Sequence, residues 1–354
     1  MRKKNNLHFL CADVSSGRLP NTQVEGLLIS TGSDCTTPKK IQDAKRMIEI
    51  AKPKHLMNDS GGYQIYLAEK NNKAMTFDPE RPLMITTKCF NLAPRHVIEK
   101  AIEMKPDSMV ALDYPIRKLK DPKAQKKEFQ KKLPQNVAWA IETAELRKKH
   151  CPDISLFIPV QAYNLKQFEE FYERIKGIDF DGFSLPVRNM SMKDIAMFLL
   201  KMHEWGVKKV HILGSSSLPV ISVCVYMSQR FFDGVSFDAT TWRISAQYGR
   251  FIQPDDLSHK SLNKTGSFDP EFSCPCQSCN GMNLGQISSL DRKERMKILV
   301  THNYLAVQNL SKEFGKAPVD AQYLKKRLAG SKRRDIKKIL RDMSEIEEMC
   351  QSDE

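Results

Sequence analysis

Short runs of β-branched and other apolar residues alternate with longer amphipathic stretches from the N-terminus to Arg250. Each short run is typical of a strand, and each longer stretch is typical of a helix. The expected strands cover residues 8–13, 26–31, 55–59, 108–113, 154–161, 182–187, 209–214 and 234–239. The expected helices cover residues 39–52, 94–105, 123–149, 165–176, 192–205 and 218–232. Eight strands with helices between them predict a (β/α)8 TIM barrel, with a doubly wound sheet as the alternative.

Polar or small residues stand at or beside the ends of five expected strands. They are Asp59, Asp113, Gln161, Gly214 and Asp238. In a (β/α)8 barrel the catalytic groups lie at the C-terminal ends of the strands. The positions of these five residues therefore support the barrel and mark one end of it as the expected site. The connection between the first two expected strands is too short for a normal helix, which departs from the barrel pattern.

A glycine-rich turn follows the third expected strand directly, where residues 58–64 read Asn-Asp-Ser-Gly-Gly-Tyr-Gln. Two adjacent glycines allow the backbone to approach another group closely or to take a positive φ. The turn would place Asp59 at the edge of a strand, beside the hydroxyl of Ser60 and the ring of Tyr63. An ordinary turn is the alternative when this motif is considered alone.

Three of the nine cysteines lie within six residues, at Cys274, Cys276 and Cys279. An odd cysteine total with such a cluster favours reduced thiols and a bound metal over disulfides. We expect His302, in the next helical stretch, to supply the fourth ligand of a tetrahedral Zn²⁺ site. Three sulfurs and one imidazole leave no open position, so the expected zinc is structural, with one ion per chain. Ordinary buried cysteines are the alternative.

The composition changes after Arg250, where residues 253–285 are rich in Pro, Ser, Asn, Gly and Cys and show little periodicity. Helical periodicity resumes at Asp291. We therefore divide the chain into a barrel (1–252), a zinc-binding insertion (253–290), and a closing helix with a basic and then acidic helical tail (291–354). A module built from loops would gain folding free energy from the metal.

The formal net charge is +14, and much of it lies in two runs. Residues 117–132 carry eight basic and two acidic side chains, and residues 325–341 carry nine basic and one acidic side chain. Neutralisation of phosphates drives nucleic-acid affinity, so we expect a nucleic-acid partner, with solvated helix faces as the alternative. No stretch resembles a membrane span or a secretory signal, so the expected location is the cytoplasm.

Three motifs in this order resemble the tRNA-guanine transglycosylase family of queuosine biosynthesis. They are the Asp-Ser-Gly-Gly turn at 59–62, the Val-Ser-Phe-Asp run at 235–238, and the cysteine cluster with His302. The resemblance implies that Asp238 is the nucleophile on the sugar C1′ and that Asp59 is the acid/base. Carboxylates are suited to both roles. A helix-capping or salt-bridged aspartate is the alternative for each.

The resemblance also implies a set of residues around the exchanged base. Tyr63 would stack on one face of the base, and Leu213 with Gly214 would close the other face. Asp113 and Gln161 would read the edge of guanine through hydrogen bonds. The expected base-binding set is Ser60, Tyr63, Asp113, Gln161, Leu185, Leu213 and Gly214. An ordinary strand-end aspartate and a packed aromatic ring are the alternatives for Asp113 and Tyr63.

The chain departs from the family pattern at several places. Gln161 is followed by Ala-Tyr rather than two glycines, and residues 182–188 lack the family's glycine-rich turn. Thr-Thr-Trp-Arg at 240–243 replaces the Pro-Thr-Arg that follows the nucleophile in the family. These departures resemble the DNA-acting branch of the family (DpdA-like proteins), which places 7-deazaguanine bases in DNA.

The expected function is the exchange of a nucleic-acid guanine for a 7-deazaguanine of the preQ0 or preQ1 type, with DNA favoured over tRNA. The alternatives are a tRNA-guanine transglycosylase of queuosine biosynthesis and a non-catalytic nucleic-acid-binding member. A pure binder has no need of the Asp59–Asp238 pair. A metal-dependent hydrolase would need histidines at strand ends, but His8, His55 and His211 lie within or at the starts of strands. A homodimer or a partner protein is also expected.

Overall fold

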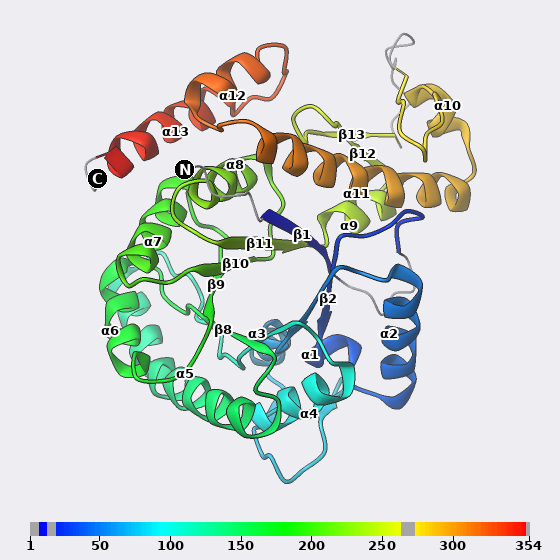
Figure 1. Cartoon of the computed structure of the whole chain (residues 1–354). Coiled ribbons are helices and arrows are strands. Elements are labelled where there is room, and N and C mark those ends of the chain that lie inside the picture. The colour runs from blue at the N-terminus through cyan, green and yellow to red at the C-terminus, as the bar shows by residue number, and fades with distance from the viewer. Residues whose placement is uncertain (1–6, 13–18, 263–272, 352–354) are drawn as a thin grey trace.

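The computed structural model describes residues 7–12, 19–262 and 273–351. Eight parallel strands close into a barrel (Figure 1), in the order β1-β11-β10-β9-β8-β7-β3-β2. They are β1 (Leu7–Cys11), β2 (Gly26–Ser30), β3 (His55–Asp59), β7 (Ser108–Val110), β8 (Ser155–Pro159), β9 (Gly182–Pro186), β10 (Lys209–Leu213) and β11 (Gly234–Ala239). The (β/α)8 barrel is confirmed, and the doubly wound alternative is wrong because β1 pairs with both β2 and β11.

Six helices outside the barrel are those expected from the sequence. They are α2 (Pro38–Ala51), α4 (Pro94–Met104), α5 (Pro122–His150), α6 (Leu165–Ile175), α7 (Met192–Glu204) and α8 (Leu218–Ser228). Side chains that precede four of them accept hydrogen bonds from first-turn amides and so fix where these helices begin. The capping residues are Thr37, Asp121, Asn164 and Ser191.

Helix α11 (Arg292–Lys316) completes the outer ring. It packs against β1, β12 (Arg250–Ile252), α8 and α9 (Thr241–Gln247), and Figure 1 shows it running alongside β1. The ring of Tyr304 in α11 stacks on Phe9 of β1 with centroids 5.6 Å apart. The described residues between β1 and β2 form no helix. Helix α11 therefore covers the outside of β1, where a helix after that strand would otherwise lie.

Several short elements were not expected from the sequence. Two helices, α1 (Thr31–Asp34) and α3 (Gly62–Lys70), follow β2 and β3, and a small sheet lies between β3 and β7. Its strands are β4 (Ala74–Thr76), β5 (Met84–Ile85) and β6 (Cys89–Asn91). Near the metal cluster, β12 pairs with β13 (His259–Ser261), and α10 (Leu284–Ser289) precedes α11. These elements are too short for hydrophobic periodicity to reveal them.

The inside of the barrel is apolar on one side and polar on the other. An apolar cluster fills it from β1, β2, β3, β7 and β8, with contributions from Leu10, Ala12, Leu28, Met57, Val110 and Phe157. On β9, β10 and β11 the residues in register at one level are Ser184, His211 and Ser236. Ser184 and His211 are fully buried. A polar strip therefore runs inside the barrel toward the end of β11.

The chain ends in two helices, α12 (Ala321–Arg327) and α13 (Ile336–Gln351). Helix α13 packs against α7, and Figure 1 shows both C-terminal helices, in orange and red, outside the ring near α7 and α8. The loop between them turns back toward β12 and β13. Among the described residues, no helix has the length and apolarity needed to cross a membrane.

Candidate active site and metal centre

The glycine-rich turn after β3 is packed too tightly for side chains. Gly61 has φ +93°, and a Cβ there would lie 2.5 Å from the Cα of Gly32. A Cβ on Gly62 would lie 1.9 Å from Oδ1 of Asp113. Both separations are far below van der Waals contact. The two glycines therefore let the turn approach α1 and Asp113, as the motif predicted.

Asp59 lies at the end of β3, and one of its carboxylate oxygens is fixed by two hydrogen bonds. Its Oδ2 accepts hydrogen bonds from Ser30 Oγ at 2.9 Å and from the backbone N–H of Gly61 at 3.0 Å. Burial raises the pKa of Asp59, and the negative charge of Asp238 raises it further, against the lowering by the Ser30 hydrogen bond. A carboxyl with a raised pKa holds a proton at a higher pH than a solvated one, which suits an acid.

Asp238 lies near the end of β11 and is 7% exposed. Its Oδ1 accepts a hydrogen bond from the backbone N–H of Gly214 at 2.8 Å, and Nε2 of His211 lies 3.3 Å from the same oxygen. Within the described part of the chain, Oδ2 makes no hydrogen bond or ion pair. One oxygen is thus anchored to the loop after β10, and the other oxygen is without a polar partner in the described structure.

His211 is a site residue that the sequence did not predict. It is fully buried on β10, and its Nδ1 lies 2.8 Å from Ser236 Oγ on the neighbouring strand. A neutral ring that accepts from Ser236 at Nδ1 would carry its proton on Nε2, which lies 3.3 Å from Asp238 Oδ1 but is not aligned for a hydrogen bond among the described residues. The register of β10 against β11 brings these three residues together. A sequence without strand register gives no sign of this contact.

Asp113 and Gln161 form the second pair at the mouth of the barrel. Gln161 Nε2 donates to Asp113 Oδ2 at 2.5 Å, and Ser60 Oγ donates to Asp113 Oδ1 at 3.4 Å. The other end of the glutamine amide, Oε1, accepts from the backbone N–H of Ile116 at 2.9 Å. Burial, followed by the charge of Asp59, raises the pKa of Asp113 to about 7.

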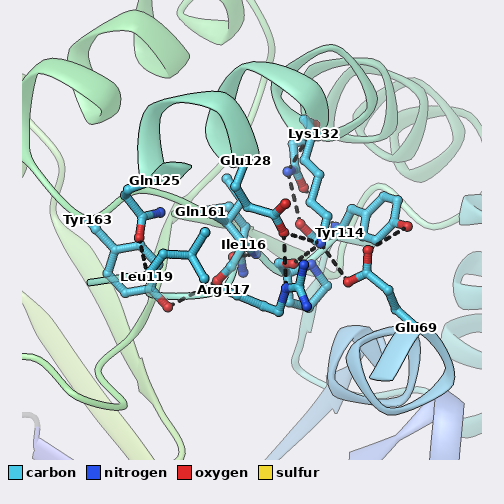
Figure 2. Close-up of polar contacts among 12 residues, drawn as sticks. Glu69, Tyr114, Ile116, Arg117, Leu119, Gln125, Glu128, Lys132, Gln161 and Tyr163 are labelled. Carbon is cyan, nitrogen blue, oxygen red and sulfur yellow. Dashed lines mark hydrogen bonds and ion pairs between the residues drawn. The ribbon is translucent and has the colours of Figure 1, made fainter. Parts of the chain in front are cut away.

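A buried lysine braces the segment that follows Asp113 (Figure 2). Lys132 of α5 has a side chain that is 1% exposed, and its Nζ donates to the backbone oxygen of Pro115 at 2.8 Å. The same ammonium pairs with Glu69 of α3 at 2.8 Å and with Glu128 of α5 at 2.9 Å. It therefore ties the segment after β7 to two helices, which holds Asp113 and the bond to Gln161 in place.

Of the other expected base-binding residues, Tyr63, Leu213 and Gly214 are at least partly exposed, whereas Leu185 is buried. Tyr63 is 51% exposed in the first turn of α3, with its ring stacked on Tyr66 at 5.8 Å between centroids. Leu213 is half-buried at the end of β10, and Gly214 after it is exposed with φ +80°. Leu185 does not join this group, because it is fully buried in the core between the strands and the helices.

Cys274, Cys276, Cys279 and His302 converge as the spacing predicted. The three sulfurs lie 3.4, 3.4 and 3.5 Å from His302 Nδ1, and the four ligand atoms lie within 4.8 Å of one another. A tetrahedral zinc with bonds of about 2.3 Å to sulfur and about 2.0 Å to nitrogen separates S from N by about 3.5 Å. The four residues therefore fit this ion in both donor type and spacing.

The surroundings of His302 support the same conclusion. Its Nε2 lies 2.8 Å from the backbone oxygen of Ile252 and donates to it, which leaves Nδ1 free of a proton and facing the sulfurs. The ring of Phe251 stacks on the imidazole at 3.8 Å between centroids. A metal-bound histidine whose second nitrogen donates to a carbonyl is the usual arrangement at such sites. The centre joins the 273–283 segment to α11 and β12.

Comparison with known proteins agrees with this geometry. The family described as queuine tRNA-ribosyltransferase matches residues 26–320. Two curated relatives from strains of Methanococcus maripaludis, both named tRNA-guanine(15) transglycosylase, are 22% identical over 222 and 221 residues. Each alignment covers 60% of this chain and 32% of the relative, so the chain matches about a third of the length of these proteins. The chain belongs to the queuine tRNA-ribosyltransferase family, the tRNA-guanine transglycosylases.

Proposed function

We propose that this protein is a nucleic-acid guanine transglycosylase that exchanges guanine for a 7-deazaguanine of the preQ0 or preQ1 type. The observation that carries the proposal is the pair of unlike carboxylates at one end of the barrel. Asp238 has one oxygen anchored and one free, and Asp59 has a raised pKa. A nucleophile and an acid with these separate properties are what a two-step displacement at a sugar carbon needs.

In the first step, Oδ2 of Asp238 attacks C1′ of the target nucleotide. A C1′–O bond forms while the bond from C1′ to the guanine nitrogen breaks, and Asp59 donates its proton to the departing base. In the second step, Asp59 removes a proton from the incoming 7-deazaguanine. The freed nitrogen then attacks C1′ and releases Asp238. The proton balance closes, because Asp59 ends each cycle as it began.

The base would lie between Tyr63 and Leu213 after leaving the nucleic-acid stack. Tyr63 is exposed and offers a ring face, and Leu213 stands at the end of β10 beside the loop that anchors Asp238. Asp113, Gln161 and Ser60 form one hydrogen-bonded group that would read the edge of the base. Leu185 has no part in this assignment because its side chain belongs to the outer core.

We propose that the four-residue centre holds a structural Zn²⁺. Bound zinc would supply folding free energy to a segment with few apolar residues of its own. Ligation by Cys274, Cys276, Cys279 and His302 leaves no open position for a substrate. The chemistry at Asp238 and Asp59 therefore proceeds without the metal.

We favour DNA over tRNA as the substrate because the departures from the family pattern surround the site. Tyr163 replaces a glycine and its hydroxyl donates to the backbone oxygen of Ile116 at 3.0 Å. Trp242 is buried, and its Nε1 donates to the backbone oxygen of Ala239 at 2.8 Å, directly after the nucleophile. Both side chains therefore bond to backbone that lies next to the expected substrate path. The named activity of the curated relatives favours tRNA, which is the second candidate.

The test is base exchange by the purified chain, with labelled guanine offered alongside duplex DNA, single-stranded DNA and bulk tRNA. Label in DNA alone supports the proposal, and label in tRNA alone contradicts the DNA preference while keeping the activity. Incorporation into none of the three contradicts the activity. Asp238→Asn is the control, since it keeps the shape of the side chain and removes the nucleophile.

A further inference from the structure

The chain beyond the family match folds back onto the turn between β12 and β13. The match ends at residue 320, and the loop between α12 and α13 then docks on the turn that joins β12 to β13. The N–H of Arg333 at Nη1 donates to the backbone oxygen of Asp256 at 2.8 Å, and the hydroxyl of Ser331 bonds to the carboxylate of the same aspartate. This loop is thus held beside residues that follow the nucleophile strand.

The docked loop forms one wall of a pocket of about 450 Å³. Other lining residues are Ser215 and Ser217 in the loop after β10 and Thr241 after β11, together with the apolar side chains of Ile252, Leu257 and Val307. Ser215 follows Gly214, whose N–H bonds to Asp238, and Thr241 lies three residues beyond that aspartate. The pocket therefore adjoins the proposed reaction centre on the same end of the barrel.

The charge in this pocket is positive. Arg333 forms a two-contact pair with Asp335, at 2.9 and 2.7 Å, so these two charges compensate each other. Arg334 lines the pocket, is exposed, and has no partner within the described ranges. His259 also lines the pocket. Burial lowers the pKa of His259, and the charges of Arg250 and Arg333 lower that pKa further. The charge of Arg334 is therefore left for a ligand.

The N-terminus of the helix that begins at the pocket adds to its positive electrostatic potential. Ser217 is the N-cap of α8 (Leu218–Ser228), and its side chain makes no capping hydrogen bond. In the first turn of α8, Leu218 and Val220 carry backbone N–H groups and Pro219 has none. These two amides and the positive end of the helix dipole favour an anion there. The hydroxyls of Thr241 and Ser258 also line the pocket and can donate to an oxygen anion, whereas that of Ser215 donates to Ser217 Oγ at 3.4 Å. A guanidinium with two hydroxyl donors is the set that binds a phosphate.

We infer that this pocket binds a phosphate of the nucleic-acid backbone beside the exchanged nucleotide, with Arg334 and the start of α8 as its anion-binding groups. The inference rests on the proposed function, which supplies a nucleic acid as substrate. The phosphates of a nucleotide lie one sugar away from its C1′, and the pocket lies beside the loop that anchors the attacking aspartate. The segment beyond the family match thereby takes part in substrate positioning.

Two matched pairs of variants test the pocket in the full chain. Ser217→Asp and Ser217→Asn are both favoured N-caps, so both should keep α8 folded, and only the first places a negative charge in the pocket. Arg334→Gln removes a lining charge, and Lys332→Gln removes an equal charge from an exposed neighbour that does not line the pocket. Thermal unfolding of all four shows whether each variant is folded.

Binding of labelled duplex DNA, single-stranded DNA and bulk tRNA is then measured over a range of KCl concentrations. We expect Ser217→Asp and Arg334→Gln to weaken binding of the preferred nucleic acid by about 3- to 10-fold, and Arg334→Gln to lower the salt slope by about 1. Ser217→Asn and Lys332→Gln should stay within about twofold of the parent. Equal affinities within each pair would overturn the inference.

Two further measurements separate the possible failures. If wild-type protein exchanges guanine but the paired variants bind alike, the pocket inference is overturned and the proposed function stands. If no exchange occurs but the pairs differ in binding, the pocket stands and the proposed function is overturned. The last measurement is the thermal stabilisation of the parent and of Arg334→Gln by inorganic phosphate. If Arg334→Gln abolishes it without changing nucleic-acid binding, the pocket serves a free phosphate and the inference is overturned.

Discussion

Asp238 and Asp59 are carboxylates at the same end of the barrel, and the groups around them differ in charge and hydrogen bonding. The anchored oxygen of Asp238 faces a backbone amide and an imidazole, both of which stabilise negative charge. Asp59 is placed where burial and the charge of Asp238 favour its protonated form. The sequence shows two aspartates in suitable motifs. Only the fold shows that the charge of Asp238 acts on Asp59.

The first prediction at this scale concerns the acid. Asp59→Asn should lower the rate of base exchange by about 10²- to 10⁴-fold, because a general acid–base group contributes about that much. Formation of the covalent intermediate should slow most for guanine and least for a substrate whose leaving base needs no proton. Single-turnover kinetics on both substrates measures this. Equal losses on the two substrates would show that Asp59 has another role.

The second prediction concerns His211, which we assign as a positioning residue for Asp238. The His211 Nε2 atom lies 3.3 Å from Asp238 Oδ1 without an aligned hydrogen bond, so the about 1.5–3 kcal/mol of a hydrogen bond to a charged group is an upper limit. His211→Leu should therefore lower kcat by up to about 100-fold with little change in KM. His211→Gln retains an N–H donor and should recover part of that loss. A merely structural role would give equal losses for Leu and Gln, or would change KM instead. Steady-state kinetics of both variants decides between these roles.

The third prediction concerns the pKa of Asp113, which is raised to about 7. An acid whose pKa is higher in the folded than in the unfolded state favours folding below the unfolded pKa of about 4, and this stability is lost as the pH rises toward 7. The full effect is about 4 kcal/mol at most. Asp113→Asn should therefore lose less stability between pH 5 and 8 than the parent does. Urea unfolding at both pH values measures the difference, and parallel losses would contradict the raised pKa.

At the scale of elements, the sequence predicted the eight barrel strands and six helices well. Strands of a parallel barrel are buried on both faces, so each appears as a continuous apolar run such as Gly26–Ser30. The small sheet of β4, β5 and β6 has two or three residues per strand and exposed positions, so it left no pattern. Neighbouring strands and their register are set by closure of the barrel. The contact between His211 and Asp238 could therefore not be predicted.

The Asp-Ser-Gly-Gly turn gives a prediction about packing. Gly62→Ala places a Cβ 1.9 Å from an oxygen of Asp113, and overpacking of this kind destabilises by about 1–3 kcal/mol. The same change at Gly177 meets nothing within 4 Å and serves as the control. Urea unfolding should show a loss for Gly62→Ala alone. Similar unfolding curves for the two variants would mean that the backbone of the turn can shift to make room for the added Cβ without loss of stability.

The metal centre gives the second prediction for an element. Purified protein should contain one zinc per chain, and Cys276→Ser should abolish zinc binding and lower the free energy of unfolding. Cys89→Ser alters an exposed cysteine outside the cluster and should change neither property. Metal analysis with thermal unfolding tests both variants. A folded Cys276→Ser protein with unchanged stability would show that the centre is dispensable.

At the scale of the whole molecule, some of the basic side chains form ion pairs with carboxylates, and others have none among the described residues. In the basic run 117–132, Lys132 is buried and paired with two glutamates, and Arg117 pairs with Glu128. In the run 325–341, Arg327 pairs with Glu313 and Arg333 pairs with Asp335, whereas Arg334 stays available. The sequence predicted a polyanion partner from the sum of these charges. The fold shows which of them are already paired with carboxylates.

The central claim is a covalent bond between the nucleic-acid sugar and Asp238. The direct measurement is a denaturing gel of wild-type, Asp238→Asn and Asp59→Asn proteins after incubation with labelled DNA or tRNA without an incoming base, followed by peptide mapping. We expect a labelled protein band in the wild type that maps to the β11 peptide containing Asp238, and no such band in Asp238→Asn. Base exchange without this band, or a band that persists in Asp238→Asn, would contradict the account.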